Sequence, residues 1–205
     1  MKSHHSGAQI SRRSWLFAGL VLPVCPALAA SRLRVYFDGD NLHVAAPELH
    51  FLTGKPLSRL HDGATVVFLS QLTVFSEDGS RVFRRAPERL TISYDVWEEK
   101  FSVMLATVGR SARRLSASEA ETWCLDNLAI SALGMAPDWP FRLRFEMQAK
   151  DPRELSSVVG DSGISLSGMI DIFSRKPRSQ EAPVTLETGT LRLAELPRAI
   201  GRRNG

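Results

Sequence analysis

The sequence predicts a mainly β, β-rich α+β fold: an antiparallel, sandwich-like sheet packed by one main helix at about 116–133 and by a shorter C-terminal helix. Two observations carry this prediction. Apolar and polar residues alternate along most of the chain after residue 31, which is the period of half-buried strands. Clusters of turn residues separate these stretches, whereas the segment that begins at Ser116 has helical spacing instead.

The first strands are predicted as a hairpin. Residues 32–37 alternate, 38–41 supply the turn residues Asp-Gly-Asp-Asn, and Leu42 and Val44 resume the apolar face. Residues 57–60 have the spacing of a single helical turn.

A long strand is expected at 65–75, and its continuous apolar run indicates burial on both faces near its start. The turn Glu77-Asp78-Gly79-Ser80 ends it. Val82 and Phe83 then predict a short strand, after which the chain passes Pro87.

Residues 88–108 give the clearest hairpin. On the ascending strand one face carries Leu90, Ile92, Tyr94 and Val96, and on the descending strand one face carries Phe101, Val103 and Leu105. The core is therefore expected to close around this hairpin.

The sequence contains typical residues for the start and the end of the main helix. Ser116 and Glu119 form a capping box, and Gly134 with Pro137 beyond it predicts the end. Two apolar stripes indicate that both sides of the helix are covered; they consist of Leu125, Leu128 and Ala132, and of Trp123 and Ile130.

The rest of the chain contains two more strands and a second helix. Residues 141–147 alternate strictly, and a last strand is expected at 184–193. Between them 175–183 reads as a linker. The shorter C-terminal helix rests on the helical spacing of Leu166, Met169, Ile170 and Phe173.

The N-terminus has the three-part layout of an export signal. Basic residues precede an apolar stretch at 15–24, which is too short to span a bilayer stably, and Ala27 and Ala29 give the small-x-small pattern of a cleavage site after Ala29. The expected organisation is an export signal at 1–29, one β-rich domain at 31–197 and a basic flexible tail at 198–205.

Arg12 and Arg13 resemble the twin-arginine motif, which implies export in the folded state. Trp15 and Phe17 depart from the usual residues of that motif, so Sec export stays open. An uncleaved N-terminal anchor also stays open, whereas lipidation of Cys25 is disfavoured because no small residue precedes it. All routes lead to a periplasmic or secreted protein.

Charge argues against nucleic acid as a partner. The formal net charge is +4, but Lys2, Arg12 and Arg13 belong to the leader, which leaves about +1 for the mature domain. Arginines cluster at 81–85 and 110–114, where a solvated surface explains them, and in the tail, where an anionic membrane is a minor alternative.

Cys124 is the only cysteine after the leader, so the mature chain forms no intramolecular disulfide. On the flank of an apolar helix it is expected to be a small buried thiol rather than a nucleophile. A domain of about 175 residues buries enough surface to fold on its core alone.

The tip of the 88–108 hairpin is the candidate partner-binding site. It carries Asp95, Trp97, Glu98 and Glu99. Paired carboxylates can serve acid–base chemistry or bind a cation only where a cleft perturbs their pKa or supplies further ligands. Hairpin tips are commonly polar, so Trp97 is expected to fold across the strands as packing.

Gly160-Asp161-Ser162-Gly163 resembles the nucleophile stretch of chymotrypsin-like serine proteases, with His61 and Asp95 as conceivable partners of Ser162. The match ends after four residues, and no histidine has the expected context. A turn before the second helix is the simpler interpretation, so no catalytic residue is assigned and the protein is expected not to be an enzyme.

No metal or cofactor is expected. His43, His50 and His61 are spaced too widely to share a helix face, and Cys-x-x-Cys, phosphate-loop and dinucleotide patterns are lacking.

The stretches "LTISYDVWEEKFSV", "MIDIFSRK" and "TGTLRLAEL" resemble a DUF4390-like family of uncharacterised exported bacterial proteins with a β-rich domain. This resemblance implies the fold and the compartment, and it carries no catalytic residues.

Three functions remain open. The first is a non-catalytic binding or accessory module of the cell envelope, which would engage an unknown protein through a sheet edge, the hairpin tip or the groove beside the helix. The second is a carrier of a small apolar ligand, suggested by the bulky residues on both sides of strand 65–75. The third and least favoured is a hydrolase at Ser162.

Overall fold

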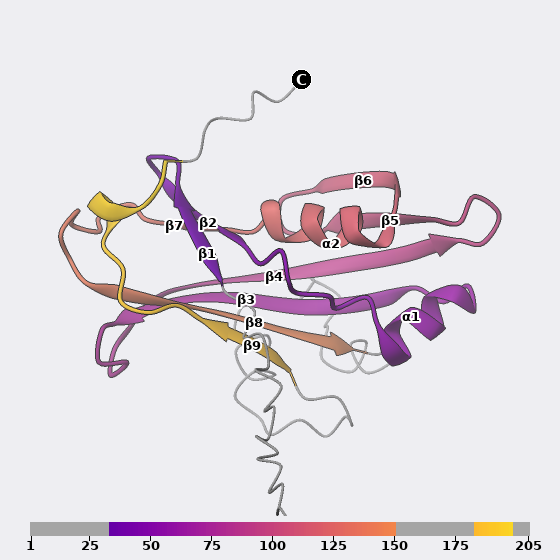
Figure 1. Ribbon diagram of the computed structural model, residues 1–205, viewed down its shortest axis with the longest axis horizontal. Coiled ribbons are helices and arrows are strands. Elements are labelled where there is room, and N and C mark those ends of the chain that lie inside the picture. Colours follow the sequence, from indigo (N-terminus) through magenta and orange to yellow (C-terminus); the bar gives the residue numbers. More distant parts are fainter. Residues whose placement is uncertain (1–32, 151–182, 199–205) are drawn as a thin grey trace, which may run out of the picture. The chain divides into compact units, whose positions relative to one another are not determined.

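The computed structural model describes residues 33–150 and 183–198, which belong to one compact unit, Ser31–Gly205. The predicted fold class is confirmed: two antiparallel sheets and two helices build a β-rich α+β fold (Figure 1). The elements are β1 (Arg34–Phe37), β2 (Asn41–Ala45), α1 (Gly54–His61), β3 (Val66–Ser76), β4 (Val82–Asp95), β5 (Lys100–Leu105), β6 (Arg110–Leu115), α2 (Ala117–Asp126), β7 (Ala129–Ser131), β8 (Phe141–Lys150), β9 (Val184–Glu187) and the 3-10 turn η1 (Leu193–Glu195).

The large sheet has the strand order β6-β5-β4-β3-β8-β9, so β3 lies in the interior of the sheet between β4 and β8. In β3 the residues from Val66 to Phe75 are buried on both faces, so the prediction for this strand is confirmed and extends along nearly its whole length. Alternate residues face the core, and these are Val66, Phe68, Leu72 and Val74.

The small sheet has the order β1-β2-β7 and confirms the predicted first hairpin, since Val35 pairs with Val44 across it. It lies over one face of the large sheet, next to α2 (Figure 1).

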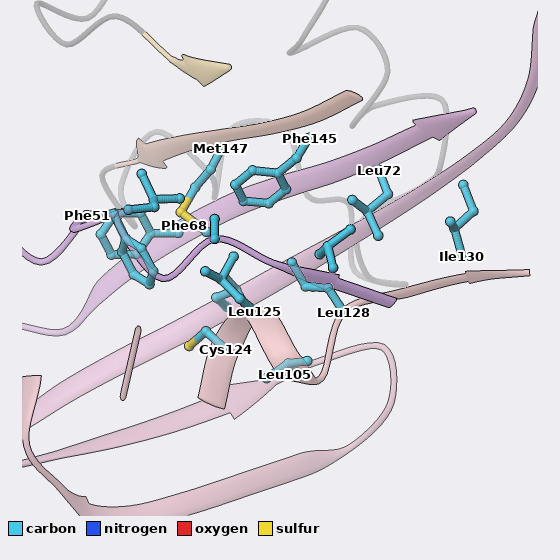
Figure 2. Packing of buried hydrophobic residues seen from close by; sticks show 14 of the residues in the cluster. Phe51, Phe68, Leu72, Leu105, Cys124, Leu125, Leu128, Ile130, Phe145 and Met147 are labelled. Atoms are coloured by element: carbon cyan, nitrogen blue, oxygen red, sulfur yellow. The ribbon is translucent and has the colours of Figure 1, made fainter. Parts of the chain in front are cut away.

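The core fills the space between the large sheet on one side and the small sheet, α1 and α2 on the other (Figure 2). Phe51, from the connection before α1, meets Phe68 of β3 edge to face, with ring centroids 5.1 Å apart. Leu105, Phe145 and Met147 bring β5 and β8 into the same cluster.

The main helix is shorter than predicted. The capping box is confirmed: Ser116 Oγ accepts from Glu119 N, and Glu119 Oε2 accepts from Ser116 N at 2.8 Å. But α2 ends at Asp126 rather than near 133, with the Asn127 side chain donating to the Trp123 carbonyl at 2.8 Å. The predicted end was wrong because β7 follows at once and pairs Ile130 with Leu42 of β2.

The short strand predicted at Val82 and Phe83 was also wrong, because β4 continues from Val82 through Pro87 to Asp95. The pairing of β4 with β5 begins only at Leu90, opposite Leu105. At Pro87, therefore, β4 is paired with β3 alone. A proline lacks one backbone donor, and a stretch that pairs on one side tolerates this loss.

Two further differences concern strands. The polar strand β6 had not been predicted, and the last strand is shorter than 184–193 because β9 ends at Glu187 and η1 follows. Arg198 forms an isolated β-bridge with Phe37. The first residue of the predicted flexible tail is therefore paired with β1.

The predicted leader at 1–29, the helix around 166–173 and the rest of the tail lie outside the described residues. Neither α1 nor α2 is long and apolar enough to cross a membrane.

The core position of Phe145 predicts a large loss of stability on truncation. Phe145 is fully buried, so Phe145→Ala should lower the free energy of unfolding by about 3–5 kcal/mol in urea denaturation followed by circular dichroism. Val108→Ala, at a side chain that is 53% exposed, is the matched control and should change it by less than about 0.5 kcal/mol. Equal effects of both substitutions would contradict the assignment of the core.

Candidate functional site

The tip of the β4–β5 hairpin is an ordered turn. Asp95 ends β4, and its Oδ1 accepts hydrogen bonds from the backbone N–H groups of Trp97 at 2.9 Å and Glu98 at 3.0 Å. Glu99 takes a left-handed conformation with φ of 53°, which turns the chain into β5. The Asp95 carboxylate therefore fixes the backbone that carries the Trp97 side chain.

Trp97 does not pack across the strands, so that expectation was wrong. Its residue is 96% exposed, and the neighbouring Val96 is 54% exposed. The end of the core is already closed by Tyr94 and Phe101, whose ring centroids lie 4.8 Å apart, and the His61 ring of α1 packs against Tyr94 in a tilted contact at 4.7 Å. Trp97 lies beyond this aromatic layer, past the end of β4.

A second contact braces the tip from β6. Glu98 accepts two hydrogen bonds from Arg114, at 3.1 Å from Nε and 2.8 Å from an Nη atom. These bonds raise the pKa of the Arg114 guanidinium, with the charge of Glu98 as a further cause. Arg114 itself has a positive φ of 61°, next to an irregularity in the β5–β6 register.

The tip therefore presents an exposed apolar pair, Val96 and Trp97, next to three carboxylates that make different contacts. Asp95 caps the turn and Glu98 is paired with Arg114, while Glu99 is exposed. Exposed carboxylates of this kind suit recognition better than acid–base chemistry, which needs a water-poor environment. Among residues 33–150 and 183–198, no group of three His, Cys, Asp or Glu residues could hold a metal ion.

The three histidines considered for a metal site have separate surroundings. His61 packs against the Tyr94 ring, whereas Nε2 of His43 lies 2.8 Å from Oδ2 of Asp38. Burial raises the pKa of Asp38, but hydrogen bonds from His43 and from the backbone at 40 and 41 outweigh it and hold this pKa well below its usual range. Ser162, the third residue of the conceivable triad with His61 and Asp95, lies outside the described residues.

His50 has a partner that the sequence did not suggest. Its Nδ1 lies 2.9 Å from Oε2 of Glu121 on α2, and Oε1 of the same carboxylate accepts from Leu52 N at 2.7 Å. Glu121 is buried while His50 is exposed, so the carboxylate fastens the connection before α1 onto α2. The sequence could have indicated this partner, because Glu121 lies on the buried face of the helix with Ala120 and Cys124, and a buried carboxylate needs a hydrogen-bond partner.

Cys124 is a free, buried thiol on α2. Burial, with a smaller effect of the Glu121 charge, raises its pKa to about 12. A thiolate is therefore scarce at neutral pH, as expected of a packing residue rather than a nucleophile.

The arginine clusters divide between surface and structure. Arg84 donates to the carbonyls of Ser131 at 2.9 Å and Leu133 at 3.0 Å and so fastens β4 to the end of β7. Arg81 lies over the Phe83 ring at 5.6 Å, and Arg110 bonds Asn127 at 3.1 Å. The export residues Arg12, Arg13, Ala27 and Ala29, together with Cys25, lie outside the described residues.

Comparison with known proteins gives no relative: no family model, no curated protein and no solved structure matches this chain. The resemblance to DUF4390-like proteins therefore stays a prediction.

The exposure of Trp97 predicts that its ring contributes little to stability. Trp97→Ala should change the free energy of unfolding by less than about 0.5 kcal/mol. Phe101→Ala, on the same hairpin but 5% exposed, should lower it by about 3–5 kcal/mol. A loss of about 2 kcal/mol or more in Trp97→Ala would show that the ring is packed after all.

The raised pKa of Cys124 predicts slow reaction with thiol reagents. In a Cys25→Ser variant at about pH 8, dithionitrobenzoate should label Cys124 far more slowly in the native state than in urea, where the thiol pKa returns to about 8.5. Since the unfolded chain loses this proton first, the free energy of unfolding should fall as the pH rises from about 8.5 towards about 12. Equal labelling rates would contradict the burial of the thiol.

Proposed function

We propose that this protein is an exported, non-catalytic binding module of the bacterial cell envelope, which engages a partner protein through the β4–β5 tip. The observation that carries the proposal is the full exposure of Trp97 on a turn whose backbone is held by Asp95. Large apolar side chains at such positions are typical anchors of protein–protein interfaces.

Order at the tip favours binding. Glu98 is tied to Arg114, and Asp95 holds two N–H groups of the turn, so the Trp97 backbone loses little freedom when a partner binds. A surface ordered beforehand avoids part of the entropic cost of association.

The charges beside Trp97 favour a particular kind of partner. Glu98 and Glu99 follow the apolar pair directly, and Glu99 is exposed. An apolar pocket with a basic rim would accept the indole and attract the carboxylates, and complementary rim charges mainly raise the rate of association. An anionic lipid surface would repel the same carboxylates.

Export is proposed from the leader alone. The basic residues Arg12 and Arg13, the short apolar stretch and the pattern at Ala27 and Ala29 support delivery to the periplasm or beyond by the twin-arginine or Sec route. The non-catalytic assignment is supported by the buried, protonated state of Cys124 and by the exposure of the carboxylates at the tip.

Site-specific photo-crosslinking in the native envelope tests this function. A benzoylphenylalanine in place of Trp97 should give a reproducible crosslinked protein that the same probe at Val108, an exposed residue of the turn between β5 and β6, does not give. With the captured protein purified, Trp97→Ala should weaken binding by about 30-fold or more, as expected for an interface anchor.

Glu99→Lys should slow association and reduce its dependence on salt while leaving the anchor in place. The proposal fails if positions 97 and 108 crosslink the same proteins, or if Trp97→Ala binds the captured protein as tightly as the wild type does.

A further inference from the structure

Two tryptophans of the described chain are exposed, and they lie at the two ends of β4. Trp97, in the turn that follows β4, is 96% exposed, and Trp139, in the connection between β7 and β8, is 40% exposed. The Trp139 ring packs against Phe83, the second residue of β4, with ring centroids 4.3 Å apart. Tryptophan is enriched at protein–protein interfaces, so both ends of this strand qualify as contact surfaces.

An aromatic surface surrounds Trp139. The Arg81 guanidinium lies over the Phe83 ring, 5.6 Å from its centroid. Leu133, from the same connection as Trp139, is 62% exposed. We call these four residues, Arg81, Phe83, Leu133 and Trp139, the Trp139 surface. It combines exposed apolar area with one cation.

The connection that carries this surface is held in place from two sides. Arg84, next to Phe83 on β4, donates to the carbonyls of Ser131 at 2.9 Å and Leu133 at 3.0 Å. From η1, the Ala194 N–H donates to the Pro137 carbonyl at 3.0 Å. The Trp139 surface is therefore ordered before any contact forms, as the tip is, and ordered surfaces lose less entropy on association.

Trp97 and Trp139 are too far apart to meet within one molecule. β4 has fourteen residues, and a strand of that length measures about 45 Å at about 3.3 Å per residue. It runs along the large sheet, so the turns before and after it lie at opposite ends of the sheet (Figure 1). A contact between the two surfaces requires two molecules.

We propose that the partner of the tip is a second copy of this chain. Trp97 of one molecule packs on Trp139 and Leu133 of the next. This inference names the partner of the site described above and therefore rests on the proposed function. Because the two surfaces differ, the contact is heterologous, and each molecule keeps a free tip at one end and a free Trp139 surface at the other. Such a contact repeats head to tail into an open chain.

The charges at the two surfaces fit this contact but do not dominate it. Among residues 33–150 and 183–198, neither Arg81 nor Glu99 takes part in an ion pair, so each is available to the other in the contact. Glu77 and Asp78 accept hydrogen bonds from neighbouring hydroxyl groups, whereas Asp138, beside Trp139, is exposed and has the same sign as the tip. The rings therefore supply most of the affinity.

The small size of both surfaces predicts a weak contact. A turn that packs on one aromatic surface buries less than the roughly 1,200 Å² of a stable complex. We therefore expect association that grows with concentration between about 10 µM and about 1 mM.

Sedimentation equilibrium of the protein purified from the envelope tests the inference over this range. The average mass of the wild type should rise with concentration and pass that of a dimer. Trp97→Ala and Leu133→Glu should each weaken association by about 10- to 100-fold, because each removes one of the two surfaces. Val108→Ala, at an exposed residue outside both surfaces, is the control and should associate as the wild type does.

Mixing the two defective variants gives the sharpest result. Leu133→Glu keeps an intact tip, and Trp97→Ala keeps an intact Trp139 surface. An equal mixture should therefore form a dimer with one molecule of each variant and nothing larger. In the envelope, benzoylphenylalanine at 97 should capture this same chain, with the crosslinked peptide within 133–139.

The inference is overturned if the wild type stays monomeric up to about 1 mM, if its growth stops at a dimer, or if the mixture of variants forms no dimer. A stop at the dimer would indicate a symmetric contact such as tip to tip. If the probe at 97 captures a different protein and never this chain, the second copy is wrong as the partner while the proposed function stands. If positions 97 and 108 capture the same proteins, the proposed function itself fails.

Discussion

The described structure depends on the complete burial of β3. This eleven-residue strand is paired along its length with β4 on one side and β8 on the other, and from Val66 to Phe75 it is buried on both faces. Burial satisfies its backbone through two ladders and at the same time removes the apolar side chains from water. Because no disulfide ties the described residues and Cys124 is a free thiol, this central pairing has to supply the stability that a crosslink would otherwise give.

The length of β4 links this core to the candidate binding site. β4 spans fourteen residues, pairs with β3 from Val82 to Ile92, and continues past the end of that pairing to Asp95. From Leu90 onward it is also paired with β5, and the tip extends past the last residue of β4 that pairs with β3. Tyr94 and Phe101 seal the core just below the turn, so the tip rests on packed aromatic rings. The position of Trp97 is therefore set by the same strand that the core holds in place.

Much of the fold could be predicted from the sequence, because strict alternation and capping residues act locally. The alternation at 141–147 was enough to predict β8, and the capping box of Ser116 and Glu119 was enough to predict the start of α2. The end of α2 could not be predicted in the same way: Leu128, Ile130 and Ala132 fit a strand as well as a helix, and the pairing of Ile130 with Leu42 decides between them. Strand β6 has mostly charged and small residues, so only its pairing with β5 reveals it.

For the candidate site, the sequence located the tip but not the orientation of its side chains. Whether Trp97 folds inward depends on the space that Tyr94 and Phe101 leave, and that is a tertiary property. The partners of Glu121 and the ring contact between Phe83 and Trp139 span long sequence separations, which local patterns do not encode.

The polar residues in the middle of β3 are accommodated unequally within the sheet. Ser70 Oγ reaches the Glu88 carbonyl at 3.4 Å, and Thr73 Oγ1 accepts from Gln71, so these side chains are accommodated within the sheet. The Gln71 carbonyl oxygen is not, and leaving such a group unpaired costs about 1–3 kcal/mol. A methionine or leucine at 71 would avoid this cost on a strand that is otherwise largely apolar. The sheet therefore carries an uncompensated polar group on its most buried strand, and the pairing of β3 with β4 and β8 has to outweigh that cost.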